Sequence, residues 1–216
     1  MTVAERSSVR HPAWADVPDA QWNDWRWQMR ARVTDLATLA GLVALTDEER
    51  RGIAGRADAF PFAVTPYYLS LMQGPDCPVR RQAIPHADEL RTTPWDMRDP
   101  LGEDEHSPVS ILTHRYPDRA LLYVTHHCAV YCRHCTRQRK VGDETSAPSR
   151  AELDAAFEYL ARTPAVKDVL VSGGDPLSLS DGRLRDIVAR LRAIEHIDVI
   201  RLCTRKPVTM PQRITP

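Results

Sequence analysis

Apolar positions follow two different patterns along the chain, and the change falls near residue 120. In the first part, apolar side chains recur at three- and four-residue steps, which is typical of one face of an amphipathic helix. These positions are Trp22, Trp25, Met29, Val33 and Leu36. After residue 120, short continuous apolar runs alternate with helical stretches. We therefore predict a helical and irregular region over residues 1–120 and an α/β region over residues 121–216.

Three polar residues mark helix starts within these regions. Thr46 with Glu49, and Ser149 with Glu152, have the spacing of a capping box, in which each side chain bonds the other residue's backbone N–H. Thr65 is followed by Pro66, and proline is favoured at the first helical position. The sequence therefore predicts helices that begin directly after Thr46, Thr65 and Ser149.

The second region predicts three strands with helices between them, and the first two have the apolar runs of buried strands. The apolar runs are Leu121–Thr125, Val169–Val171 and Val199–Leu202. The helix between the first two runs has its apolar face at Leu153, Ala156, Phe157 and Leu160, and the next one has it at Leu184, Ile187, Val188 and Leu191. Strands that alternate with helices indicate a parallel sheet with right-handed crossovers, and either a barrel or an open sheet fits this pattern.

Composition narrows the class of protein. Hydrophobic residues make up 43% and charged residues 27%, as in ordinary globular domains. The 29 basic residues balance the 29 acidic ones, so nothing in the charge suggests a nucleic-acid or membrane-surface partner. The longest apolar stretch falls far short of the ~20 residues that cross a bilayer. The polar N-terminus lacks the apolar core of a secretory signal, so we expect a cytoplasmic protein whose cysteines stay reduced.

Cysteines carry the clearest chemical signal. Three of the five lie in the pattern C-x3-C-x2-C, as Cys128, Cys132 and Cys135. Thiolates this close in sequence are tolerable when a metal takes up their charge. A zinc site of three cysteines and one histidine is one interpretation, completed by His126, His127 or His134. Iron–sulfur clusters normally take four cysteines, so three would leave one iron open to a substrate. Thr136 after Cys135 excludes a c-type haem attachment site.

A glycine loop follows the second predicted strand. It reads Ser172, Gly173, Gly174, Asp175 and Pro176. Because ligands bind at the carboxyl ends of parallel strands, we expect this loop and the cysteine segment to meet at one edge of the sheet. Taken alone, the loop is better explained by a plain turn from strand to helix.

The cysteine spacing, with the aromatic ring of His134 before the last cysteine, resembles the signature of the radical S-adenosylmethionine enzymes. Ser172–Asp175 resembles the glycine-rich loop of that superfamily, with aspartate in place of glutamate. Longer strings resemble the lysine 2,3-aminomutase family specifically: WNDWRWQ, THRYPDR, CAVYCRHCTRQRKVG and TRKPVTMPQRITP. The resemblance implies the first part of a partial (β/α) barrel of the radical S-adenosylmethionine type.

The resemblance also implies cofactors and site residues. Cys128, Cys132 and Cys135 match the ligands of a 4Fe–4S cluster whose open iron binds S-adenosylmethionine. Ser172, Gly173, Gly174, Asp175 and His134 match residues beside that cofactor. The family's second cofactor is pyridoxal 5′-phosphate, and Arg115 and Arg119 match its phosphate-binding arginines, because guanidinium groups suit phosphate oxygens. Arg137 matches the arginine that binds the substrate carboxylate. An electron donor such as flavodoxin or ferredoxin is implied, and a homo-oligomer is allowed.

The chain departs from the family in one respect. The family's pyridoxal-binding lysine lies in a glycine-rich segment, and none of Lys140, Lys167 and Lys206 does. We therefore expect the chain to stop in the middle of the barrel. The predicted function is a 2,3-aminomutase that acts on a free amino acid, lysine by default. Glutamate, arginine or a lysine of a protein are alternative substrates, and a non-catalytic zinc- or iron–sulfur-binding module is the alternative class.

Overall fold

The computed structural model describes residues 10–142 and 148–215. Contacts group the chain into two compact units. The helical unit comprises Met1–Asp96, Ala129–Gln138 and Arg205–Pro216, and the sheet unit comprises Met97–Cys128 and Arg139–Thr204. This grouping follows spatial contacts and differs from the division at residue 120 that the sequence suggests. The cysteine segment crosses from one unit into the other between Cys128 and Ala129.

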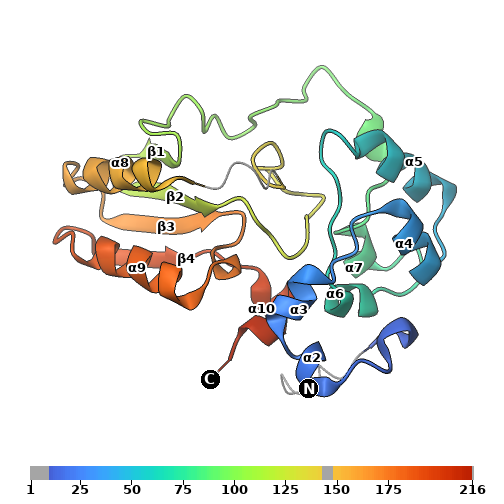
Figure 1. Ribbon diagram of the computed structural model, residues 1–216. Coiled ribbons are helices and arrows are strands. Elements are labelled where there is room, and N and C mark those ends of the chain that lie inside the picture. Colours follow the sequence, from blue (N-terminus) through green and yellow to red (C-terminus); the bar gives the residue numbers. More distant parts are fainter. Residues whose placement is uncertain (1–9, 143–147, 216) are drawn as a thin grey trace. The chain divides into compact units, whose positions relative to one another are not determined.

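The sheet unit is built on four strands in the order β1-β2-β3-β4 (Figure 1). Their bounds are Leu112–Tyr116 for β1, Arg119–Thr125 for β2, Asp168–Gly173 for β3 and Val199–Leu202 for β4. The last three pair in parallel, which confirms the predicted parallel strands. Strand β1 pairs antiparallel with β2 and lies in the part predicted to be helical or irregular, so the sheet is mixed.

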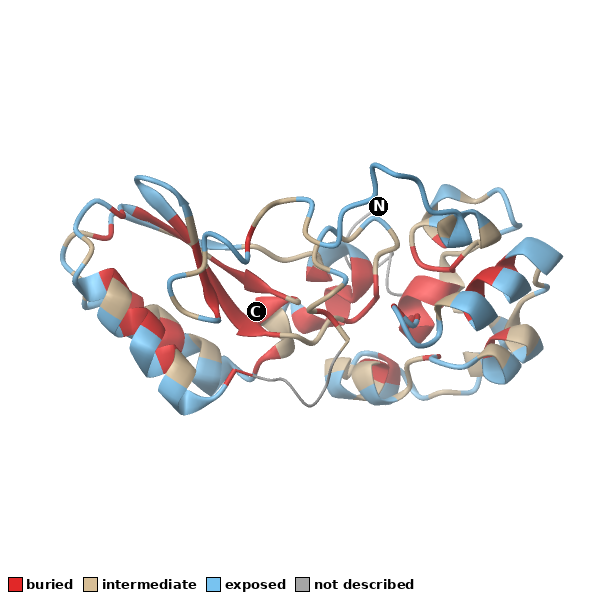
Figure 2. Cartoon of the chain, turned by 90° about the horizontal axis from the view of Figure 1, so that it is seen from above, coloured by how far each residue is buried: buried red, intermediate tan, exposed pale blue. Residues whose placement is uncertain are grey.

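Two helices cover one face of this sheet, α8 (Arg150–Ala161) and α9 (Asp181–Arg192), as Figures 1 and 2 show. Their apolar faces pack on the strands in one hydrophobic core. The capping box of Ser149 and Glu152 begins α8, as predicted. A short 3-10 helix, η4 (Pro176–Ser178), follows the glycine loop. The described strands form an open sheet and no closed barrel, which is compatible with part of an α/β barrel.

The helical unit consists of short helices around a second apolar core. They are η1 (Pro12–Trp14), α2 (Asp19–Trp22), α3 (Trp25–Arg30), α4 (Leu36–Leu42), α5 (Asp47–Arg56), α6 (Pro66–Ser70), α7 (Pro78–Arg81), η2 (Ala87–Leu90), α10 (Lys206–Thr209) and η5 (Pro211–Arg213). Thr46 and Glu49 form the predicted capping box of α5, and Thr65 caps α6 with Pro66 at its first position.

The continuous helix suggested by Trp22 to Leu36 is wrong. The Asp24 side chain accepts a hydrogen bond from the Arg26 N–H and starts a new helix, α3, after α2 has ended. Val33 then adopts an extended conformation and forms a bridge with Val64. Of the five apolar side chains, Trp22 and Val33 are buried and Leu36 packs against the core of the helical unit, and these three come from separate elements. None of the helices in the described residues combines the length and apolar character needed to cross a bilayer.

Candidate functional site

The carboxyl ends of β2 and β3 lie side by side in the sheet unit. Thr125 pairs with Gly173 in the strand register. Beyond the strands, the Gly174 N–H donates to the Thr125 carbonyl oxygen at 2.6 Å, and the Asp175 N–H donates to the His127 carbonyl oxygen at 2.8 Å. The predicted meeting of the glycine loop with the start of the cysteine segment is therefore confirmed.

Both glycines are required by this close backbone packing. Gly173 has a φ of 112°, in the region that favours glycine, and a Cβ there would overlap the Thr125 carbonyl oxygen. A Cβ on Gly174 would lie 2.5 Å from the His127 carbonyl oxygen. The glycine loop thus holds the backbone that leads directly to Cys128.

Buried polar side chains fix the glycine loop in turn. Asp175 is buried, and its Oδ1 accepts hydrogen bonds from the Leu177 N–H at 3.0 Å and the Thr204 hydroxyl at 2.7 Å. Ser172 is buried in β3. The Ser178 hydroxyl donates to the His127 carbonyl oxygen at 3.1 Å. The loop after β3 is therefore tied both to the end of β2 and to the residues after β4.

The second part of the cysteine segment is anchored in the helical unit. Val130 belongs to the core of that unit, and the Tyr131 N–H donates to the Ala63 carbonyl oxygen at 3.1 Å. The backbone then turns tightly, with the Cys135 N–H donating to the Cys132 carbonyl oxygen at 2.9 Å. Cys132 and Cys135 are both half-buried, as is Cys128 in the sheet unit.

Arg133, between these two cysteines, anchors the segment to the helical unit through several contacts. Its guanidinium donates to the Glu89 carboxylate at 2.7 Å, to the Pro61 carbonyl oxygen at 2.9 Å and to the Phe60 carbonyl oxygen at 3.1 Å. It also lies 4.5 Å from the centre of the Phe60 ring. The sequence analysis assigned no role to Arg133, and its only signal is its position inside the cysteine motif.

A second arginine missed by the sequence analysis contacts a cysteine directly. Arg205 lies at the start of α10, and its Nη1 donates to the Cys132 sulfur at 2.6 Å. Its Nη2 donates to the Tyr68 hydroxyl at 3.3 Å and to the Gln82 side-chain oxygen. Burial works to lower the pKa of Arg205, but the Cys132 and Tyr68 groups outweigh it and raise that pKa above its usual value.

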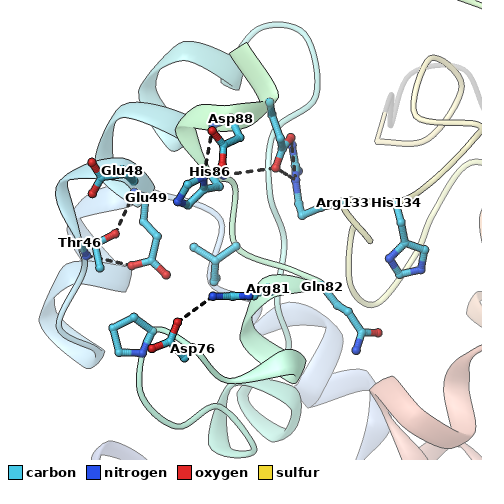
Figure 3. Close-up of a pocket in the computed structure, with 13 residues that line it drawn as sticks. Thr46, Glu48, Glu49, Asp76, Arg81, Gln82, His86, Asp88, Arg133 and His134 are labelled. Carbon is cyan, nitrogen blue, oxygen red and sulfur yellow. Dashed lines mark hydrogen bonds and ion pairs between the residues drawn. The ribbon is translucent and has the colours of Figure 1, made fainter. Parts of the chain in front are cut away.

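A cavity of about 640 Å³ in the helical unit opens beside Arg133 and His134 (Figure 3). Its charged lining is largely paired: Arg81 bonds Asp76 at 2.7 Å, as Figure 3 shows, and His86 lies 3.0 Å from Asp88. Burial and the nearby Arg205 charge lower the pKa of His134 below its usual value. This direction of the shift favours the uncharged form of the His134 ring.

The arginines predicted to bind phosphate, Arg115 and Arg119, lie away from the glycine loop. Arg115 and Arg119 flank the β1–β2 turn, at the amino end of β2, where Arg115 donates to the Leu101 carbonyl oxygen at 2.7 Å and Arg119 lies 3.4 Å from the Asp168 carboxylate. Six residues of strand, or about 20 Å, separate this end from Thr125. The structure therefore does not bring Arg115 and Arg119 to the glycine loop. Arg137 is half-buried in the helical unit, two residues after Cys135.

The donor set fits an iron–sulfur cluster in its chemistry. All three motif cysteines are in the thiol form and not in disulfides, and soft thiolates are the ligands such clusters take. The Arg205 guanidinium at the Cys132 sulfur suits a sulfur that carries negative charge. Within residues 10–142 and 148–215, no three cysteine, histidine or acidic side chains are already gathered in a metal-binding arrangement.

Comparison with known proteins shows which iron–sulfur family and which enzymes this chain is similar to. Residues 118–204 match a family described as a 4Fe-4S single cluster domain. L-lysine 2,3-aminomutase of Clostridium subterminale is 49% identical over 96% of this chain and 50% of its own length. The enzyme of the same name from Bacillus subtilis is 48% identical over 94% of this chain and 43% of its own. Glutamate 2,3-aminomutase of Clostridioides difficile is 42% identical over 91% of this chain and 47% of its own.

The chain belongs to the lysine 2,3-aminomutase family. It spans about half the length of the curated relatives it matches. The resemblance read from the cysteine string and its neighbouring strings is thereby confirmed at the level of the family.

Proposed function

We propose that this chain carries the cluster-binding part of a radical S-adenosylmethionine aminomutase. The observation that carries the proposal is the similarity along 96% of the chain to a lysine 2,3-aminomutase, which includes the whole C-x3-C-x2-C segment. The adjacent ends of β2 and β3 support it, because they place Cys128 directly after a backbone that is hydrogen-bonded to the glycine loop. When bound, the 4Fe–4S cluster supplies the electron that cleaves S-adenosylmethionine.

Three groups of residues in this chain would hold the cluster and its ligand: the motif cysteines, the glycine loop and His134. Cys128, Cys132 and Cys135 hold three irons and leave the fourth open. Gly173 and Gly174 let the loop after β3 pack directly against the backbone that leads to Cys128, which fixes the position of this cysteine. His134 directly precedes the last cysteine of the motif and would lie beside S-adenosylmethionine, as the family resemblance implies.

The reaction proposed for the whole protein is the transfer of an amino group between carbons 2 and 3 of a free amino acid, with pyridoxal 5′-phosphate as second cofactor. Lysine is the proposed substrate, since most of the relatives named above act on it by name, and glutamate is the second candidate because one relative is a glutamate 2,3-aminomutase. Arg137 would bind the substrate carboxylate in either case. A phosphate-binding role for Arg115 in β1 and Arg119 at the start of β2 stays a prediction.

Anaerobic reconstitution with iron and sulfide tests the proposal. We expect the wild-type chain to turn brown, to take up four irons, and to show a change in the electron paramagnetic resonance spectrum of the reduced cluster when S-adenosylmethionine is added. Reduced flavodoxin, ferredoxin or dithionite can supply the electron. Cys128→Ser, Cys132→Ser and Cys135→Ser should each lose this signal.

Matched controls come from the two cysteines outside the motif. Cys77 and Cys203 are also half-buried thiols but lie outside the motif, so Cys77→Ser and Cys203→Ser should keep the cluster. A colourless protein that holds one equivalent of zinc through the motif cysteines would overturn the proposal in favour of a zinc-binding module.

A further inference from the structure

Arg205 and Cys132 lie in contact although 73 positions separate them in the sequence. The 2.6 Å distance between Arg205 Nη1 and the Cys132 sulfur is short for an N–H to sulfur contact and places a positive charge directly on this side chain. Both residues belong to the helical unit. The contact is therefore internal to one compact body of the chain.

The guanidinium is held from three sides. Its Nη2 bonds the Tyr68 hydroxyl and the Gln82 side-chain oxygen, and its planar group lies 5.8 Å from the centre of the Tyr68 ring. Tyr68 is fully buried and Gln82 also bonds the Pro78 carbonyl oxygen through its amide at 3.2 Å. An arginine with this many fixed donors keeps little rotamer freedom to lose when a ligand binds.

The backbone of Arg205 is fixed as well. Its carbonyl oxygen accepts hydrogen bonds from the Thr209 N–H at 3.0 Å and the Thr209 hydroxyl at 3.2 Å. The Thr209 carbonyl oxygen accepts in turn from the buried Thr65 hydroxyl at 2.9 Å. Thr65 is the cap of α6, the helix that carries Tyr68. The fold thus fixes the position of the Arg205 guanidinium beside the Cys132 sulfur.

Such a fixed charge has a definite effect on a thiolate that ligates an iron–sulfur cluster. An electron added to the cluster is shared with its sulfur ligands, so a donor at one sulfur stabilises the reduced state more than the oxidised state. Arginine stays charged at every working pH. The charge acts in a half-buried place, where water screens it less than at the surface.

We propose that Arg205 is a positioning residue that holds the Cys132 thiolate in place and raises the reduction potential of the cluster through its hydrogen bond to that sulfur. The inference rests on the proposed function, since it requires that Cys132 ligate the cluster. It adds a residue that lies outside the cysteine motif and outside the glycine loop.

The test compares the midpoint potential of the reconstituted chain with that of Arg205→Gln and Arg205→Lys, by redox titration followed by electron paramagnetic resonance. We expect Arg205→Gln to disfavour reduction about tenfold, which is about 59 mV for a one-electron couple. Arg205→Lys keeps the positive charge but lacks the planar guanidinium, so its midpoint potential should lie between those of wild type and Arg205→Gln. Tyr68→Phe removes one partner of the guanidinium and leaves the sulfur contact, so it should change the potential less than Arg205→Gln does.

Arg201→Gln is the matched control. Arg201 is an arginine on β4 that pairs with Asp168 at 2.9 Å, and its side chain is 57% exposed, so its loss should leave the potential unchanged. Equal potentials in wild type and Arg205→Gln, with the cluster fully assembled in both, would overturn the inference and leave the proposed function standing. A weaker affinity for S-adenosylmethionine with no change in potential would also overturn it, because Arg205 would then contact the nucleotide and not the sulfur. Failure of the wild-type chain to assemble a cluster would instead remove the proposed function.

Discussion

Gly174 lies directly against the backbone of His127, so that a single added carbon on Gly174 would come within 2.5 Å of the His127 carbonyl oxygen. The same carbonyl accepts hydrogen bonds from the Asp175 N–H and the Ser178 hydroxyl. His127 immediately precedes Cys128, the first cysteine of the motif. The spacing of the two loops therefore depends on the absence of a side chain at one position.

Gly174→Ala tests this dependence. Because the clash is with backbone atoms, which cannot swing away, we expect the free energy of unfolding to fall by about 2 kcal/mol, as for overpacked cores. Urea titration followed by circular dichroism measures this loss. We also expect lower iron uptake on reconstitution, since the backbone before Cys128 must shift.

Gly182→Ala provides the control for the glycine substitution. A Cβ at Gly182 meets no atom within 4 Å, and the residue lies in α9. Alanine is favoured over glycine in a helix, so this variant should be as stable as wild type or slightly more stable. A Gly174→Ala chain as stable as wild type would contradict the close packing.

Asp175 and Thr204 form a second testable pair. The Thr204 hydroxyl donates to the Asp175 carboxylate at 2.7 Å, which links the glycine loop to the residues after β4. A double-mutant cycle with Asp175→Ala, Thr204→Val and both together should give a coupling energy of about 1.5 kcal/mol, as for a hydrogen bond to a charged acceptor. Urea unfolding of the four proteins yields the coupling. Additive losses would show that this bond contributes nothing of its own to the position of the loop.

Local signals in the sequence predicted local structure correctly. The capping boxes at Thr46 and Ser149 need only a partner three residues away, and both formed as expected. The three parallel strands were also predicted. Strands β2 and β3 are buried at most positions and are therefore apolar along most of their length. Strand β4 has a similar apolar run, although it lies at the end of the strand order and is mostly exposed. The superfamily followed from the C-x3-C-x2-C spacing, and the family followed from the longer strings around it, such as CAVYCRHCTRQRKVG.

Features that depend on distant partners were not predicted. Strand β1 contains Thr113, His114 and Arg115, so it lacks the apolar run of a buried strand and is recognised only by its pairing with β2. The contact of Arg205 with Cys132 joins residues far apart in the chain. The helix predicted through Trp22 failed because the Asp24 side chain competes for backbone donors and starts a new helix.

Glu49 and Arg80 form a buried ion pair that predicts a dependence of stability on pH. Arg80 Nε and Nη2 donate to the two carboxylate oxygens of Glu49 at 2.6 and 2.7 Å. Burial works to raise the pKa of Glu49, but the hydrogen bonds from Arg80 and Thr46 outweigh it and lower that pKa below its usual value. The stabilisation is therefore complete at neutral pH, above the pKa of the unfolded chain, and is lost as the pH falls through the lowered pKa of the folded state.

Glu49→Gln should lose about 3 kcal/mol of unfolding free energy at pH 7, because it leaves the Arg80 charge buried without a partner charge. The loss should shrink as the pH is lowered, when Glu49 of the wild type is itself protonated. Urea titrations between neutral and acidic pH measure both effects. Glu48→Gln is the control, since Glu48 pairs with Arg51 on the surface and should change stability by less than about 1 kcal/mol at any pH. A constant difference between Glu49→Gln and wild type across this range would contradict the assignment.

Arg133 anchors the segment between Cys132 and Cys135, and its removal should affect both stability and cluster binding. Arg133→Ala would leave the carbonyl oxygens of Phe60 and Pro61 without this donor and Glu89 without its closest ion-pair partner. We expect a loss of about 3 kcal/mol in the free energy of unfolding, as for a broken buried network.

The decisive measurement for Arg133 is iron content after reconstitution, compared with that of Arg81→Ala. Arg81 lines the same cavity, but its ion pair with Asp76 is exposed, so its loss should cost less than about 1 kcal/mol and leave iron uptake unchanged. Arg133→Lys keeps the charge but lacks the planar group that reaches three acceptors, so we expect it to recover only part of the lost iron. Full iron uptake by Arg133→Ala would contradict this prediction, because the turn between Cys132 and Cys135 would then keep its shape without the contacts of Arg133 to Glu89, Pro61 and Phe60.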